Sequence, residues 1–230
     1  MTFIVNLLHK DFSILLSDKK ANTDGPTTIK VGKITVRAEK GATIIGFQKI
    51  FLSGCNLVAL GIAGNANKHS YINDLPGITN IDDALKLVRS HMEHFLGVHN
   101  RSEIMQQQSS RENQSIATFF DRIESAYFSN LFLFSKIHNH TMLYKAPERG
   151  GMLIHVGSGS NIFEKTIGKN EIERFASSVA SIDMLAHYLE WFSGVFKKIS
   201  EVDDGVGEDF TGVISTRESP NFVRLNMANN

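Results

Sequence analysis

The sequence predicts an α+β domain in which runs of strands alternate with runs of helices. Three observations carry this prediction. The first third is rich in apolar and β-branched residues, a long pattern of helical period follows, and β-like and helical stretches then alternate to the end. No internal repeat or low-complexity linker divides the 230 residues, so a single domain over residues 1–230 is the simplest organisation.

The composition is that of an ordinary globular protein, with 42% hydrophobic and 21% charged residues. Lys and Arg together number 24, as do Asp and Glu, and this balance argues against a nucleic-acid partner. Cys55, the single cysteine, is expected to be a small buried residue in a reducing compartment. No signal-peptide pattern or apolar run of about 20 residues is present, so we expect a cytoplasmic protein without a membrane partner.

The first third predicts strands. Phe3–Leu8 and Ser13–Ser17 are expected to pair as a hairpin through the turn-like residues His9–Phe12. Thr27–Arg37 (TTIKVGKITVR) interleaves β-branched and polar residues and predicts a further hairpin. Additional strands are expected at Thr43–Ile45, Lys49–Leu52 and Leu57–Ile62.

The middle of the chain predicts a helix over Asn80–Leu96, with Asn80 as its N-cap and apolar residues on one face. The polar stretch Asn100–Gln114 is expected to be a loop or a solvated helical turn. Phe119, Phe120 and Ile123 have helical spacing, so Ile116–Tyr127 is also assigned to a helix.

The second half returns to strands and then to helices. Strands are expected at Leu131–Ile137, Met142–Lys145 and Met152–Val156, with turns between them. Glu171–Ile199 predicts one or two helices, whose apolar stripe is expected to be core. Two final strands are expected at Phe210–Ser215 and Phe222–Leu225.

Four places carry residues suited to chemistry: Thr2, Asp18, the segment Lys49–Gly64 and the segment Gly157–Ser160. Singly, each has an ordinary structural explanation, such as a turn residue or a solvated strand position. In their order and spacing they resemble the proteasome β-type subunits, which are N-terminal-nucleophile hydrolases. That family has a mature N-terminal Thr, an apolar run ending in Asp, a Lys in a short strand, an AGG-like turn and a GSGS-type turn.

The resemblance implies a role for each matching residue. Thr2 would be the nucleophile, Lys49 would lie beside it and Asp18 would pair with Lys49. Ser158 would hydrogen-bond near the amine, and the backbone N–H of Gly64 would stabilise an oxyanion. The implied fold is an αββα four-layer sandwich, the implied assembly is a homo-oligomer such as a ring, and the branch implied is bacterial or archaeal.

The chemistry of such a constellation follows from general principles. A threonine hydroxyl is a poor nucleophile and needs a base to take its proton. An α-amine titrates near about 7.7–8.0, so part of it is free base at neutral pH. Thr2 carries such an amine only after Met1 has been removed, and the small size of Thr2 suits that removal.

The sequence departs from the family pattern in two places. A hairpin insertion is expected at about residues 19–46, so Lys30 and Lys33 compete with Lys49 for the catalytic position. Lys49 is preferred because Gly64 follows it by 15 residues. The family also has a D-x-x-S-G segment that supports the amine, for which Asp204 is the candidate here, with Gly207 where serine is expected.

Three functions remain open at this point. The first is a threonine-type peptidase or amidase that acts on peptide or protein substrates. The second is a catalytically inactive ring or regulatory subunit of proteasome-like fold. The third is a peptide ligase that uses the same acyl-enzyme. No cofactor is expected, and no metal, because His138 and His140 lack an acidic or cysteine neighbour in sequence.

Overall fold

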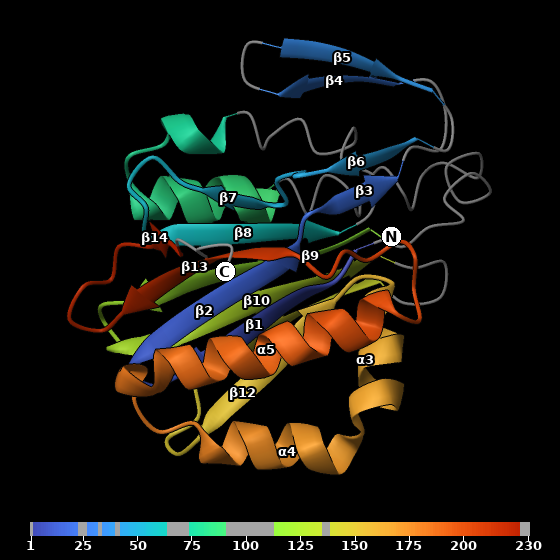
Figure 1. Cartoon of the computed structure of the whole chain (residues 1–230). Helices are drawn as coiled ribbons and strands as arrows, with labels where there is room; N and C mark the ends of the chain where they lie inside the picture. The colour runs from blue at the N-terminus through green and yellow to red at the C-terminus, as the bar shows by residue number, and fades with distance from the viewer. Residues whose placement is uncertain are drawn as a thin grey trace.

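The computed structural model describes residues 2–22, 27–31, 34–39, 42–63, 74–90, 113–134 and 139–225. It is an α+β structure, as the sequence predicts, with two five-stranded antiparallel sheets and two smaller two-stranded sheets (Figure 1). Within the described ranges, no helix has both the length and the apolar character needed to cross a membrane.

The first large sheet holds the start of the chain at its centre. Its order is β12-β1-β2-β13-β14, and its strands are β1 (Ile4–His9), β2 (Phe12–Asp18), β12 (Gly151–Val156), β13 (Phe210–Thr216) and β14 (Val223–Arg224). The predicted hairpin of the first two strands is confirmed, with Ile4 opposite Ser17. Every residue of β1 and β2 is buried, which explains why these strands read as nearly continuous apolar runs.

The second large sheet has the order β11-β10-β9-β8-β7. Its strands are β7 (Ile50–Leu52), β8 (Val58–Ala63), β9 (Asn113–Asp121), β10 (Ala126–Phe134) and β11 (Asn139–Lys145). The helix expected over Ile116–Tyr127 is therefore wrong, because β9 and the start of β10 form a hairpin there. β9 contributes apolar residues to two cores, one on each face, so it shows no simple alternation to distinguish it from a helix.

The small sheets lie between β2 and β7 in the chain. They pair β3 (Lys20–Asn22) with β6 (Thr43–Ile45), and β4 (Thr27–Val31) with β5 (Ile34–Ala38). The second pair is the hairpin that TTIKVGKITVR predicts.

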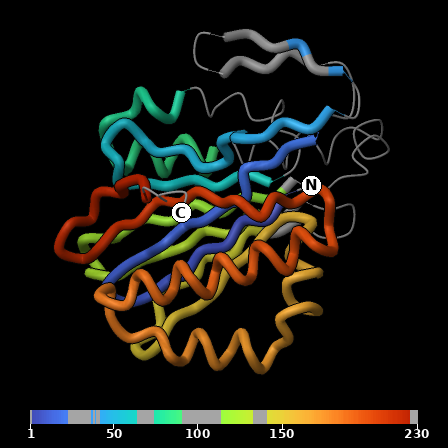
Figure 2. The backbone as a smooth tube through the Cα atoms, in the orientation of Figure 1, coloured from blue at the N-terminus to red at the C-terminus, as the bar shows by residue number. Residues whose placement is uncertain are grey.

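Helices cover the outer faces of the large sheets. They are α3 (Gly159–Ile167), α4 (Lys169–Ser178), α5 (Leu185–Ser200) and residues 81–90, with 3₁₀ turns at Leu75–Gly77 and Ile182–Met184. Figure 1 shows α3, α4 and α5 together on one side of the molecule, and Figure 2 traces the chain between them. Helical structure in this half begins at Gly159, earlier than the predicted Glu171, because α3 follows the glycine-rich turn directly.

The expected cap of the middle helix is present, since Asn80 Oδ1 accepts the Asp82 N–H at 2.8 Å and the Asp83 N–H at 3.4 Å. The described helical residues end at 90, so the predicted end near Leu96 lies outside the described residues.

Three apolar clusters organise the core. One joins Phe3, Val5 and the outer face of the first sheet to α3, α4 and α5, and it includes the expected apolar stripe of α5. A second lies between the two large sheets. A third joins β8 and β9 to residues 81–90. Strand alternation thus sends neighbouring residues of β1 into different clusters.

A buried polar network also connects the two large sheets. Ser13 Oγ on β2 donates to Asn6 Oδ1 at 2.9 Å and lies 2.8 Å from Thr118 Oγ1 on β9. Asn6 Nδ2 donates to Ser129 Oγ on β10 at 3.1 Å. All four side chains are fully buried, so these hydrogen bonds favour one lateral placement of the sheets.

Candidate active site

Thr2 lies just before β1 and is 7% exposed. Its backbone nitrogen donates to Ser158 Oγ at 3.1 Å, and its carbonyl oxygen accepts the Gly159 N–H at 3.2 Å. The next N–H, that of Phe3, donates to Asp18 Oδ1 at 2.8 Å. The backbone around Thr2 is therefore fixed by contacts with two segments far away in the sequence.

Asp18 ends β2 and forms a buried ion pair with Lys49. Lys49 Nζ lies 2.8 Å from both carboxylate oxygens. Asp18 is 0% exposed and Lys49 is 3% exposed. Of the lysines in competition, Lys49 thus contacts Asp18, whereas Lys33 and the side chain of Lys30 lie outside the described residues.

The Asp18 carboxylate has further partners on the backbone. Its Oδ2 accepts the Lys20 N–H at 3.1 Å and the Gly207 N–H at 3.3 Å, in addition to the Phe3 N–H on Oδ1. These N–H groups and Lys49 give both oxygens of the buried carboxylate hydrogen-bond partners. The N–H that follows Thr2 and the ammonium of Lys49 share one oxygen, which brings the Lys49 charge to the Thr2 backbone.

Burial lowers the pKa of Lys49 below its usual value, and the charge of Asp18 and its hydrogen bond to Lys49 oppose this shift. Desolvation disfavours an ammonium because the charge loses its hydration. Lys49 is consequently a better proton donor to its surroundings than a solvated lysine.

Ser158 connects Thr2 to a second carboxylate. Its Oγ accepts from the Thr2 nitrogen and donates to Asp203 Oδ2 at 3.4 Å. Asp203 Oδ1 accepts the Gly205 N–H at 2.8 Å, and Asp203 is 5% exposed. Because Ser158 donates its hydroxyl hydrogen bond to Asp203, the lone pairs of its oxygen are available to accept from the Thr2 nitrogen.

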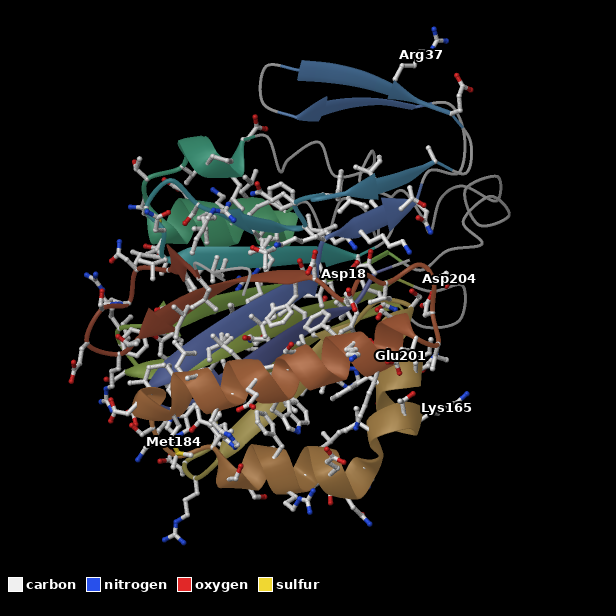
Figure 3. All side chains as sticks on the ribbon, in the orientation of Figure 1. Asp18, Arg37, Lys165, Met184, Glu201 and Asp204 are labelled. Carbon is white, nitrogen blue, oxygen red and sulfur yellow. The ribbon has the colours of Figure 1, made fainter. Side chains whose placement is uncertain are left out.

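The residue that contacts Ser158 is therefore Asp203, and the neighbouring Asp204 is exposed. Figure 3 shows Asp204 on the loop that follows α5, and Asp18 inside the molecule. Counting the D-x-x-S-G pattern from Asp203 places Gly207 at its glycine and Val206, which is 1% exposed, at its serine. The family spacing already distinguishes the two aspartates, because counting from Asp203 places Gly207 at the glycine of the pattern, whereas counting from Asp204 places Glu208 there.

Gly64, the expected oxyanion residue, lies outside the described residues, as does His138. The last described residue of β8, Ala63, is nevertheless close to the site. A Cβ built at Gly157 would lie 3.4 Å from the Ala63 side chain and 2.1 Å from the carbonyl oxygen of Thr2. Ala63, the residue that precedes Gly64 in the sequence, therefore lies beside Gly157 and close to Thr2.

His155 on β12 lies next to Phe3 and Phe163, which belong to the core cluster that joins the first sheet to α3, α4 and α5. Its ring is 6.5 Å from the ring of Phe3 and 5.0 Å from that of Phe163. Nε2 is 3.6 Å from Glu164 Oε1, and buried Nδ1 has no hydrogen-bond partner within the described part of the chain. Burial lowers the pKa of His155, with Glu164 opposing the shift.

Comparisons with known proteins support the fold. No protein-family model and no curated protein matches the chain. Among solved structures, it is similar to a mutant of Anbu from Hyphomicrobium sp. strain MC1, at 14% identity and a TM-score of 0.58. The match covers 98% of this chain and 85% of the Anbu chain.

This result corrects the assignment to the proteasome β-type subunits of a bacterial or archaeal branch. That assignment is wrong as stated, since the match to Anbu at 14% identity supports a relationship in fold and no closer one. What the comparison supports is a proteasome-like fold.

Proposed function

We propose that this chain is an N-terminal threonine hydrolase that cleaves peptide or amide bonds through an acyl-threonine intermediate after removal of Met1. The observation that carries the proposal is the convergence of two polar systems on one residue. Ser158 accepts a hydrogen bond from the Thr2 nitrogen and donates one to Asp203. Asp18 accepts the N–H of Phe3, the next residue, and pairs with Lys49. A proteasome-like fold supports this reading.

Loss of Met1 would turn the Thr2 nitrogen into an amine. An N–H of that amine would donate to Ser158, which leaves the nitrogen lone pair free to take the proton of the Thr2 hydroxyl, directly or through a water. The Lys49 ammonium would favour the developing alkoxide by its charge. The Thr2 oxygen would then bond to the substrate carbonyl carbon and produce an oxyanion.

The remaining steps return the enzyme to its starting state. The amide C–N bond breaks, and the proton held by the amine passes to the leaving nitrogen. Water then attacks the acyl-threonine ester, giving a carboxylic acid and the free Thr2 hydroxyl. The attack of water produces a second oxyanion. By resemblance, the backbone N–H of Gly64 would bind this oxyanion and the one formed when Thr2 attacks the amide. With this function we also propose the αββα sandwich, a homo-oligomer, a peptide or protein substrate and a cytoplasmic location.

A second candidate is a catalytically inactive proteasome-like subunit. One observation favours it, because Val206 is a buried apolar residue at the position where the family pattern has a serine that supports the amine. The amine then lacks the support that this serine would give. Ligation by the same acyl-enzyme differs only in whether an amine or water accepts the acyl group.

The test begins with the intact mass of the purified protein. We expect a loss of one methionine residue and an N-terminal Thr2. A peptide epoxyketone, which reacts with both the hydroxyl and the free amine, should then form a single adduct on Thr2. Thr2→Ala should abolish the adduct, and Thr216→Ala, a change at the far end of β13, should not. Met1 retained in every preparation would favour the inactive subunit, and product analysis with an added amine would separate ligation from hydrolysis.

A further inference from the structure

The turn Gly157–Gly159 determines where the Thr2 backbone lies. Gly159 donates its N–H to the Thr2 carbonyl, and Ser158 accepts from the Thr2 nitrogen. Gly157 has φ of 99° and packs so closely that an added Cβ would lie 2.1 Å from the Thr2 oxygen. Any displacement of this turn would therefore move Ser158 relative to Thr2.

One side chain from the other large sheet holds this turn. Gln114, at the start of β9, accepts the Gly157 N–H through Oε1 at 2.7 Å. Because the partner is an N–H donor, the oxygen of the carboxamide must face it. Strand alternation places Gln114 on the same face of β9 as Ile116 and Phe120, which pack in the core between the two sheets.

The backbone of Gln114 contacts the other half of the site. It pairs with Ala63, the last described residue of β8, which directly precedes Gly64. One residue thus joins the strand that leads into the expected oxyanion residue to the turn that carries Ser158. A neutral acceptor at this place also adds no charge next to the Thr2 nitrogen.

We propose that Gln114 is a positioning residue of the Thr2 site, which holds Gly157 so that Ser158 meets the Thr2 nitrogen while β8 stays in register beside it. This inference rests on the proposed function. Small misplacements of reacting groups reduce rates strongly, and about 1 Å can cost roughly 100-fold. Loss of the Gln114 contact should therefore slow acylation of Thr2 more than it weakens substrate binding.

The test compares Gln114→Met, which has similar length but no acceptor for the Gly157 N–H, with Gln114→Glu, which keeps an acceptor oxygen. Asn130→Leu is the matched control. It also removes a carboxamide from the same sheet, and the Oδ1 of Asn130 has no hydrogen-bond partner within the described residues. Two readouts are used. They are the rate of epoxyketone labelling of Thr2 from about pH 6 to about pH 9, and hydrogen exchange at the Gly157 amide.

We expect Gln114→Met to lower the labelling rate at saturating probe by about tenfold with little change in probe affinity, and to speed exchange at Gly157. Gln114→Glu should retain slow exchange and most of the rate at high pH. Its added charge should move the acid limb of the pH profile upward, which a merely structural role would not do. Asn130→Leu should match the unsubstituted protein in both readouts.

Labelling of Gln114→Met at the unsubstituted rate, or unchanged exchange at Gly157, would overturn the role of Gln114. A fall in labelling shared equally by Asn130→Leu would do the same. If the unsubstituted protein is never labelled, the proposed function fails instead, and the exchange result still decides whether Gln114 holds the turn.

Discussion

The buried pair of Asp18 and Lys49 can be tested without any assumption about catalysis. Asp18→Asn keeps the shape of the side chain but removes its charge, and leaves an ammonium that is 3% exposed without its counter-charge. Removal of one partner from a buried ion pair typically costs about 3–5 kcal/mol. The lowered pKa of Lys49 limits this cost, since the amine can release its proton instead of staying charged.

Lys49→Met should cost less, because the Asp18 carboxylate keeps three backbone donors, the N–H groups of Phe3, Lys20 and Gly207. We expect about 1–3 kcal/mol for this variant, in the range of one lost hydrogen bond to a charged group. The double variant has neither charge, so its cost should fall short of the sum of the two single costs by about 1–3 kcal/mol.

Urea unfolding of the four proteins at neutral pH, with equal denaturant slopes, measures these costs. Additive costs would refute the direct contact between the two side chains. A Lys49→Met cost as large as that of Asp18→Asn would refute the assignment of the three backbone donors, since the carboxylate would then behave as if it had no other partner.

Three further predictions follow from the packing. Gly157→Ala should abolish epoxyketone labelling and unfold at lower temperature, because the added Cβ would collide with Thr2. Gly46→Ala, where φ is 80° and no atom lies within 4 Å of the added Cβ, should cost only about 1–2 kcal/mol of backbone strain. Equal melting temperatures for the two variants would contradict this. In the unsubstituted protein, the free energy of unfolding should fall as the pH drops below the ordinary histidine pKa of 6.5, because the unfolded chain binds a proton at His155 before the folded chain does. His155→Phe should make this fall smaller. An unchanged slope of the unfolding free energy with pH would argue against a buried neutral imidazole. Ser13→Ala should cost about 1–3 kcal/mol in urea unfolding, because it leaves buried polar partners unsatisfied, and a neutral effect would mean that the network is satisfied in another way.

The sequence was sufficient for the parts of the molecule where local pattern and packing agree. The hairpin of β1 and β2 follows from two apolar runs around a polar turn, and the Asn80 cap follows from its side-chain chemistry. The α+β class was also predicted. The contact of Thr2 with Ser158 was anticipated only through a resemblance, since 156 residues separate them and no local rule connects them.

The misses have physical causes of their own. β9 looked helical because apolar residues face both of its sides, which erases the alternation that marks a half-buried strand. Gln114 gave no signal, since it ends a polar stretch and its importance comes from a turn 43 residues away. The sequence-based choice of Asp204 overlooked the spacing, since only the count from Asp203 ends on a glycine, Gly207.

The attachment of the Thr2 backbone has a practical consequence for anyone who prepares this protein. Chain ends are normally loose and tolerate added sequence. Here the backbone around Thr2 is held by the Gly159 N–H, which donates to the Thr2 carbonyl, and by Asp18, which accepts the Phe3 N–H. A tag fused ahead of Thr2 would leave the Thr2 nitrogen as a peptide N–H in these buried surroundings. Under the proposed function, a sample that keeps a leading tag would therefore have no free amine at Thr2 and would not react with the epoxyketone.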